Sequence, residues 1–211
     1  IAFDGDADRC LAVDELGNLI DGDQIMAACG LDMKDKGQLP GDTVVATVMS
    51  NLGFHVYAKE HGIELECTDV GDRNVLERMV EKGYRLGGEQ SGHMIFLEHA
   101  TTGDGQLTAL KILALLKESG KKASQVFSAC PRYPQVLINI PVADNDVKKA
   151  AMASPLLAQA VQREEEALGD EGRVLVRPSG TEALMRVMVE AKTQETAQET
   201  ARRLADLISS L

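Results

Sequence analysis

Three aspartates alternate with small residues in the segment Asp4-Gly5-Asp6-Ala7-Asp8-Arg9. Alternate carboxylates on an extended loop point toward one centre, and the small residues between them let the backbone fold around an ion. Such hard oxygen ligands suit Mg²⁺, which binds at roughly 2.1 Å in octahedral geometry. Without a cation the carboxylates would repel one another. The pattern therefore predicts a Mg²⁺ site at Asp4, Asp6 and Asp8, where water or phosphate supplies a further ligand.

An EF-hand calcium loop and a solvated acidic turn are the alternatives for this segment. The three aspartates and Glu15 fall at the first, third, fifth and twelfth positions of an EF-hand. However, Arg9 replaces the glycine that an EF-hand needs at its sixth position, and the flanking residues are typical of strands rather than helices.

Two further loops carry polar groups. The segment Gly87–His93 (GGEQSGH) places a carboxylate, an amide, a hydroxyl and an imidazole between glycines, a mixture that can bind sugar hydroxyls. A Glu or His on a loop more often has a structural role, so these residues alone do not establish a sugar-binding site.

The segment Arg177–Glu182 (RPSGTE), followed by Arg186, sets two hydroxyls and backbone N–H groups on a glycine turn. Because arginine gives forked bonds to phosphate, the two flanking arginines favour a phosphate site over an incidental hairpin turn.

Strands and helices alternate in the first part of the chain, which must position these loops. Ile1–Phe3 is predicted to end a buried strand, and Cys10–Asp14 and Asn18–Ile20 to form a hairpin. The run Thr43–Met49 is apolar and β-branched, which predicts a strand covered on both faces. The alternation predicts an α/β domain with a mixed, mostly parallel sheet. Its other strands are expected at Glu64–Val70, Arg85–Gly88 and His93–Leu97, and its helices within Asp21–Gly37, Asn51–His61, Asp72–Lys82 and Asp104–Glu118.

A second module is predicted after the proline-rich segment Pro131–Pro134. Its order β-α-β-β-α with short connections predicts a small α+β domain, an antiparallel sheet with helices on one face. The strands are Gln135–Ile140, Gly172–Arg177 and Leu184–Ala191, and the helices are Ser154–Leu168 and a final one with an apolar stripe at Ala197, Ala201, Leu204, Ile208 and Leu211.

Composition and net charge narrow the classes of partner that the chain is expected to bind. The 211 residues are 44% hydrophobic and 26% charged, which is typical of a soluble globular protein. The net charge of -11 repels a phosphate backbone, so nucleic acid is not an expected partner. No apolar run reaches the length of a membrane span, and four cysteines without Cys-x-x-Cys spacing favour a reducing cytoplasm. A phosphorylated small molecule is the expected partner, and a homodimer stays among the alternatives.

The three loops together resemble the α-D-phosphohexomutase superfamily. Its members carry a DGDxDR metal loop, a GExSG sugar loop and an RxSGTExxxR phosphate loop in this order, and here they read DGDADR, GEQSGH and RPSGTEALMR. The form GEQSGH, with VGDR at Val70–Arg73 and ATTGDG at Ala100–Gly105, is most similar to the branch that acts on glucosamine phosphate. The branches acting on glucose or mannose phosphate are the alternative. Ala183 and Asn74 depart from the family, which often has proline and an aromatic residue there.

The resemblance implies a four-domain enzyme, of which residues 1–20 would be the end of domain 2, residues 21–131 domain 3 and residues 132–211 domain 4. A phosphoserine and a catalytic lysine would lie in domain 1, so this chain is expected to fold without catalysing alone. The implied reaction moves phosphate between O6 and O1 of glucosamine through a 1,6-bisphosphate, with the phosphoserine as donor.

The resemblance also implies residue roles. Asp4, Asp6 and Asp8 would bind Mg²⁺, and Arg9 would sit near the transferred phosphate. Either His93 or the domain 1 lysine would assist proton transfer. Substrate contacts would come from the remaining matched positions: Asp72, Arg73, Glu89 and Ser91 on the sugar side, and Arg177, Ser179, Gly180, Thr181 and Arg186 around the non-reacting phosphate.

Two other functions are compatible with parts of the sequence. A haloacid-dehalogenase-type phosphatase also places Asp-x-Asp after a strand, and Gly103-Asp104-Gly105 could imitate its last motif, but it would leave the SGT loop unexplained. A regulatory module that binds a sugar phosphate without turnover is the non-enzymatic alternative.

Overall fold

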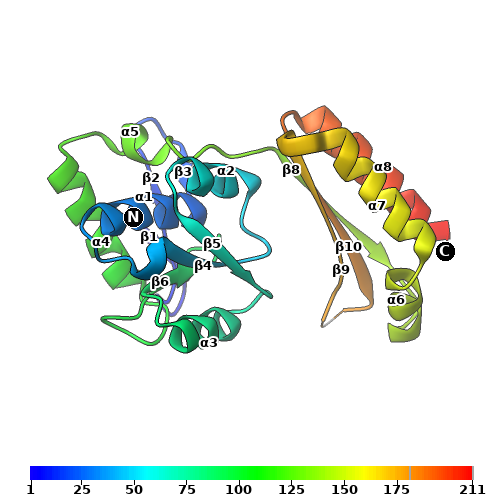
Figure 1. Cartoon of the computed structure of the whole chain (residues 1–211), viewed down its shortest axis with the longest axis horizontal. Helices are drawn as coiled ribbons and strands as arrows, with labels where there is room; N and C mark the ends of the chain where they lie inside the picture. The colour runs from blue at the N-terminus through cyan, green and yellow to red at the C-terminus, as the bar shows by residue number, and fades with distance from the viewer. Residues whose placement is uncertain (181, 211) are drawn as a thin grey trace. The chain divides into compact units, whose positions relative to one another are not determined.

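The chain divides into two compact units, Ile1–Arg132 and Tyr133–Leu211, in a computed structural model that describes residues 1–180 and 182–210 (Figure 1). Each unit has its own sheet and its own hydrophobic core.

The main sheet of the first unit is mixed, as the sequence predicts. Its strand order is β5-β4-β6-β7, where β5 is Glu64–Thr68, β4 is Thr43–Thr47, β6 is Leu86–Gly88 and β7 is Met94–Phe96. The strand β4 runs parallel to both β5 and β6, while β6 and β7 are antiparallel. Both β6 and β7 are buried along their whole length.

The strand β4 is covered on both faces, which confirms the prediction from its apolar sequence. Val44 and Ala46 belong to one core cluster, which includes α1 (Gly22–Asp35), α2 (Leu52–Glu60) and α4 (Gly105–Ser119). Val45 points to the opposite face and packs with α3 (Asp72–Lys82). The helix α3 begins after Gly71 and ends at Gly83, which takes the left-handed conformation that glycine favours (φ 74°).

A small antiparallel sheet, β1-β2-β3, carries the acidic loop. The strand β1 is Ala2–Phe3, β2 is Cys10–Val13 and β3 is Leu19–Ile20. The hairpin of β2 and β3 is therefore as predicted. The prediction that Ile1–Phe3 is buried was wrong: Ile1 and Phe3 are exposed, because β1 pairs only with β2 and has no layer over its side chains among the described residues.

The second unit is a three-stranded antiparallel sheet of order β8-β10-β9, with β8 at Gln135–Pro141, β9 at Gly172–Pro178 and β10 at Leu184–Ala191. The helices α7 (Pro155–Leu168) and α8 (Gln194–Ser210) lie on one side of it (Figure 1). The predicted apolar stripe of α8 is buried at Ala197, Ala201, Leu204 and Ile208, whereas Leu211 lies outside the described residues.

Sequence periodicity missed two short helices, α5 (Ala123–Phe127) and α6 (Asn145–Met152). Each is too short for a repeating apolar stripe, so capping and tertiary contacts define it. In α4 the expected apolar positions divide: Ile112 is buried, but Leu110 and Leu113 are 65% and 52% exposed.

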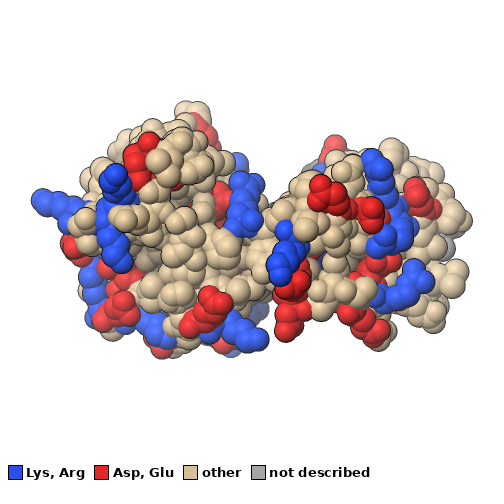
Figure 2. Space-filling model, turned by 90° about the horizontal axis from the view of Figure 1, so that it is seen from above, with Lys and Arg blue, Asp and Glu red and all other residues tan. Residues whose placement is uncertain are grey.

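Acidic and basic side chains are interspersed over both units on the face drawn in Figure 2. The expectation that nucleic acid is not a partner follows from net charge and stays a prediction. Among the described residues, helices that combine the length and the apolar character needed to cross a membrane are absent.

Shortening a buried side chain of α8 tests the core of the second unit. Leu204 is 1% exposed and Leu156 of α7 is 61% exposed. We expect Leu204→Ala to lower the free energy of unfolding by about 2–5 kcal/mol, because it leaves a cavity. The matched change Leu156→Ala should stay within about 0.5 kcal/mol of the parent chain. Amide hydrogen exchange of β10 measures both, and an equal loss of protection in the two variants would contradict this packing.

Candidate functional site

The acidic loop between β1 and β2 brings three carboxylates together. One oxygen from each of Asp4, Asp6 and Asp8 lies within 4.8 Å of the other two. The loop is closed by its own backbone, because the Arg9 N–H donates to Asp4 Oδ1 at 3.2 Å and the Ala7 N–H donates to the Asp4 carbonyl at 3.3 Å. Ala7 takes a left-handed conformation (φ 59°), which turns the loop sharply between two of the aspartates.

The electrostatics of this loop favour a cation. Burial, together with the hydrogen bond and charge of Asp4 and the charge of Asp6, raises the pKa of the Asp8 carboxyl above its usual range. The Asp8 Oδ1 atom is buried and accepts no hydrogen bond from the described residues. Arg9 Nε lies 3.6 Å from Asp4 Oδ2 and 3.9 Å from Asp8 Oδ1, so one guanidinium faces two carboxylates. An orphaned oxygen within an all-carboxylate cluster fits a hard divalent ion such as Mg²⁺.

The structure does not support the EF-hand alternative. Strands β1 and β2 flank the loop rather than helices. Glu15, which would supply the twelfth ligand, instead accepts a hydrogen bond from the Ser124 N–H at 3.2 Å.

The glycine-rich loop between β6 and β7 packs directly on the acidic loop. The Cys10 N–H donates to the Gly92 carbonyl at 3.0 Å, and Arg9 and His93 form an antiparallel bridge. A Cβ at Gly92 would approach the Cys10 carbonyl to 2.5 Å, and Gly92 has φ 93°, so two independent constraints favour glycine there. The two loops, distant in sequence, therefore form one surface.

His93 joins the two loops to the start of α3. It is only 4% exposed, with Nε2 4.0 Å from Asp8 Oδ2 and Nδ1 3.9 Å from Asp72 Oδ2. Neither distance is a hydrogen bond, and Nε2 has no hydrogen-bond partner among the described residues. The imidazole thus has a free nitrogen at the edge of the carboxylate cluster, where it can exchange a proton with a bound molecule.

The segment Ala100–Gly105 closes the other side of His93. A Cβ at Gly103 would overlap the His93 ring, and one at Gly105 would approach the Arg9 carbonyl to 2.6 Å. The Gly105 N–H also donates to the Ala7 carbonyl at 3.0 Å. Asp104 caps α4 by accepting a hydrogen bond from the Leu107 N–H at 2.9 Å. In the Gly103-Asp104-Gly105 segment, which could imitate a phosphatase motif, the aspartate is therefore a helix cap.

Asp72 and Glu89 lie beside this centre, and Asp72, Arg73 and Ser91 are all exposed. Glu89 Oε1 accepts a hydrogen bond from the Gly71 N–H at 3.1 Å, which fixes the glycine-rich loop against the start of α3. Arg73 pairs with Glu77 at 2.8 Å and keeps its side chain 85% exposed.

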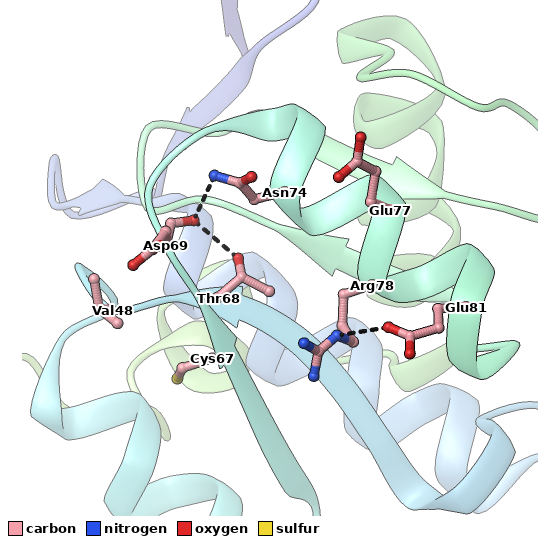
Figure 3. Close-up of a pocket in the computed structure, with 8 residues that line it drawn as sticks. All are labelled: Val48, Cys67, Thr68, Asp69, Asn74, Glu77, Arg78 and Glu81. Atoms are coloured by element: carbon pink, nitrogen blue, oxygen red, sulfur yellow. Dashed lines mark hydrogen bonds and ion pairs between the residues drawn. The ribbon is translucent and has the colours of Figure 1, made fainter. Parts of the chain in front are cut away.

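Asn74, which departs from the family pattern, stabilises the turn before α3. Its Nδ2 donates to the Val70 carbonyl at 3.1 Å and points to the Asp69 carbonyl, which also accepts from the Thr68 hydroxyl (Figure 3). This network borders a hollow of about 430 Å³ between β5 and α3 that also includes Arg78 and Glu81. Among the described residues, none of the predicted site residues lines that hollow.

Asp23 is a residue of this centre that sequence reasoning missed. It is 2% exposed, and its Oδ2 accepts from Gln90 Nε2 at 3.0 Å and from the Asn51 N–H at 2.7 Å. It therefore ties the glycine-rich loop to the start of α2. The only available signal was an acidic residue in the first turn of a predicted helix, which the helix dipole already explains.

The RPSGTE segment forms the turn between β9 and β10 in the second unit. Arg177 and Arg186 are direct partners across the two antiparallel strands, so their side chains share one face of the sheet. Burial and the charge of Arg186 lower the pKa of Arg177. The Arg186 Nε is buried without a hydrogen-bond partner among the described residues, although its Nη2 binds Glu182 at 2.7 Å. Two such guanidiniums fit a bound dianion.

The turn itself is compact. Ser179 is 4% exposed, and its Oγ accepts from the Glu182 N–H at 3.2 Å while its N–H donates to the Leu184 carbonyl at 2.9 Å. Gly180 is exposed at the tip, beside a hollow of about 500 Å³ formed with α6. Thr181, the remaining predicted phosphate ligand, lies outside the described residues. A buried lysine of α6, Lys148, also contacts this turn, and nothing in the sequence pattern indicated it.

Comparison with protein families finds two matches. Residues 21–133 match the model described as phosphoglucomutase/phosphomannomutase, alpha/beta/alpha domain III, and residues 137–207 match the C-terminal domain of the same family. The two matches together cover most of both units.

Curated relatives are similar over the whole chain. A phosphoglucosamine mutase of Saccharopolyspora erythraea is 54% identical over 211 residues, which are 100% of this chain and 47% of the relative. One from Caldanaerobacter subterraneus is 53% identical over 208 residues, covering 99% of this chain and 46% of the relative. The chain thus spans about half the length of the curated relatives it matches.

Solved structures share the fold. The N-acetylphosphoglucosamine mutase of Aspergillus fumigatus superposes with a TM-score of 0.84 at 22% identity, over 99% of this chain and 47% of that one. A structure of the Aspergillus protein in complex with GlcNAc-6P and magnesium gives a TM-score of 0.81 at 23% identity, over 97% of this chain and 51% of that one.

The contact between Gly103 and His93 can be tested directly. In Gly103→Ala the new methyl group would overlap the imidazole, so we expect the ring to leave its place between Asp8 and Asp72. The imidazole ¹H–¹⁵N signals of His93 should shift. The matched control Gly5→Ala adds a methyl with nothing within 4 Å and should leave these signals in place. Unchanged His93 signals in a folded Gly103→Ala chain would contradict the packing described here.

Proposed function

Because the chain belongs to the phosphoglucomutase/phosphomannomutase family, we propose that it is the part of a phosphoglucosamine mutase that supplies the metal, sugar and phosphate loops. The observation that carries this proposal is His93, placed by the glycine-rich loop between Asp8 of the acidic loop and Asp72 of α3. That arrangement combines a cluster of three carboxylates, polar side chains suited to hydroxyl groups and an imidazole in one surface.

Within a complete mutase, we assign residues 1–20 to the end of domain 2, residues 21–131 to domain 3 and residues 132–211 to domain 4. The family matches at 21–133 and 137–207 support this assignment. The phosphoserine donor would belong to the half of the enzyme that this chain does not span. The four cysteines are all free, which supports a reducing cytoplasmic location.

The substrate of the proposed reaction is glucosamine 6-phosphate, and the product is the 1-phosphate. A Mg²⁺ ion held by Asp4, Asp6 and Asp8 would supply charge stabilisation to the transferring phosphoryl group. Arg9, which faces two of these carboxylates, would contact the same phosphoryl group.

Glu89 and Ser91 would hold sugar hydroxyls, and Asp72 and Arg73 would contact the substrate at the edge of the site. His93 would move a proton between the sugar hydroxyl and the site, since its Nε2 has no hydrogen-bond partner among the described residues.

The turn in the second unit would hold the phosphate that does not react. Arg177 and Arg186 would supply forked hydrogen bonds, and Ser179, Gly180 and Thr181 would add hydroxyl and backbone donors. Holding one phosphate while the other reacts also explains how a bisphosphate could reorient and bind by either end. This binding energy would position the reacting oxygen rather than activate it.

A coupled assay on the complete enzyme tests the function. We expect kcat/KM to be higher for glucosamine 6-phosphate than for glucose or mannose phosphate, because the curated relatives that match the whole chain are named phosphoglucosamine mutases. Equal or better turnover of mannose phosphate would reject the sugar assignment. Absence of mutase activity in a complete, phosphorylated and Mg²⁺-supplied enzyme would reject the function itself.

Arg177→Ala tests the phosphate turn. We expect substrate affinity to fall roughly 10- to 150-fold, because a charged hydrogen bond contributes about 1.5–3 kcal/mol. The control Arg202→Ala removes an equal charge from the exposed surface of α8 and should bind normally. Calorimetry with glucosamine 6-phosphate on the complete enzyme measures both. Unchanged affinity in folded Arg177→Ala would remove this arginine from the site.

A further inference from the structure

The buried lysine of α6 makes unusual contacts for a charged residue. Lys148 is only 7% exposed, and its Nζ donates to the Ser179 carbonyl at 2.8 Å and to the Glu182 carbonyl at 2.5 Å. The start of α6 is itself fixed, because Asp144 accepts from the first N–H groups of the helix at 2.9 Å. The capped helix α6 therefore holds the ammonium against the Ser179 and Glu182 carbonyls of the RPSGTE turn.

These two bonds decide which way the turn presents its N–H groups. In a planar trans peptide the C=O and N–H point in opposite directions. The Ser179 carbonyl shares its peptide plane with the Gly180 N–H, and the Glu182 carbonyl shares its plane with the Ala183 N–H. With both carbonyls drawn toward Lys148, the Gly180 and Ala183 N–H groups point away from it. Lys148 thus contributes to the direction of two donors in the turn, together with the Leu184 N–H, which also donates to the Glu182 carbonyl at 2.9 Å.

The charge of Lys148 is also uncompensated. Among the described residues, no carboxylate lies within 4.0 Å of its Nζ, and its two hydrogen-bond partners are neutral carbonyls. Burying an unpaired cation is costly unless an anion shares the site. Together with Arg177 and Arg186 it gives the turn three positive side chains, two on β9 and β10 and one on α6.

We propose that Lys148 is a positioning residue for the phosphate-binding turn. Its ammonium orients the Gly180 and Ala183 N–H groups toward the bound phosphate and adds a positive charge behind them. The proposal rests on the proposed function, since it concerns the same phosphate. Lys148 need not touch the substrate, and it acts through the backbone it holds.

The test uses the complete enzyme and the variant Lys148→Met, which keeps the length of the side chain and removes its donors and charge. The phosphate in this turn is bound in both the ground state and the transition state, so loss of the contact should raise KM and leave kcat nearly unchanged. We expect KM for glucosamine 6-phosphate to rise about tenfold, the effect of one charged hydrogen bond. Inorganic phosphate should also become a weaker competitive inhibitor by a similar factor.

The control is Lys192→Met, which loses an exposed ion pair with Glu171 at the opposite end of β10 from the turn. It should keep the parent KM. Lys148→Arg, which restores charge and donors, should recover most of the affinity. Because the methionine variant could fail to fold, Lys148→Gln is measured in parallel, and the result is taken from the variant with a native circular dichroism spectrum.

The outcomes distinguish the positioning role of Lys148 from the phosphate site itself. An unchanged KM in a folded Lys148 variant, while Arg177→Ala still raises KM, would overturn the positioning role and leave the phosphate site intact. An unchanged KM in both would overturn the phosphate site itself, and the positioning role with it. A fall in kcat without a rise in KM would also contradict the proposal, because it would place Lys148 in the chemical step.

Discussion

The packing of His93 against glycine on one side and carboxylates on the other is the contact on which the first unit's site depends. The imidazole occupies a space that exists only because Gly103 has no side chain, and it lies within 4.0 Å of carboxylate oxygens from two different elements. The acidic loop, the glycine-rich loop, the segment Ala100–Gly105 and the start of α3 all meet at this ring. Backbone hydrogen bonds join the acidic loop to the glycine-rich loop and to the segment Ala100–Gly105, and the Glu89 side chain joins the glycine-rich loop to the residue before α3.

The acidic loop shows how geometry and electrostatics oppose each other. The fold holds three carboxylates within 4.8 Å, and burial together with the neighbouring carboxylates raises the pKa of Asp8. Strand pairing and the hydrogen bonds to Gly92 and Gly105 impose this arrangement. A loop that keeps like charges together in this way is preorganised for a cation, since the cost of assembling the ligands is met by the fold rather than by binding.

The second unit uses the opposite charge and a different device. The register of two antiparallel strands brings Arg177 and Arg186 to one face, and burial lowers the pKa of Arg177. A short turn then adds backbone donors, with Lys148 behind it. The two units therefore differ in charge at these places: the first has a carboxylate cluster beside polar side chains, and the second has paired arginines at a turn.

The sequence by itself determined the three loops, the alternation of strands and helices, and the family. Asp4–Asp8, GEQSGH and RPSGTE are local patterns, so their residues are adjacent in the sequence and can be recognised without the structure. The burial of Thr43–Thr47 could also be predicted, because a strand covered on both faces lacks the alternation of apolar and polar residues that a half-exposed strand shows. Tertiary structure alone decided that His93 lies between Asp8 and Asp72, that Asp23 holds Gln90, and that Lys148 grips the phosphate turn from a helix too short to show a periodic signal. Each of these contacts joins residues that are distant in sequence, and no spacing rule along the chain encodes such a pairing.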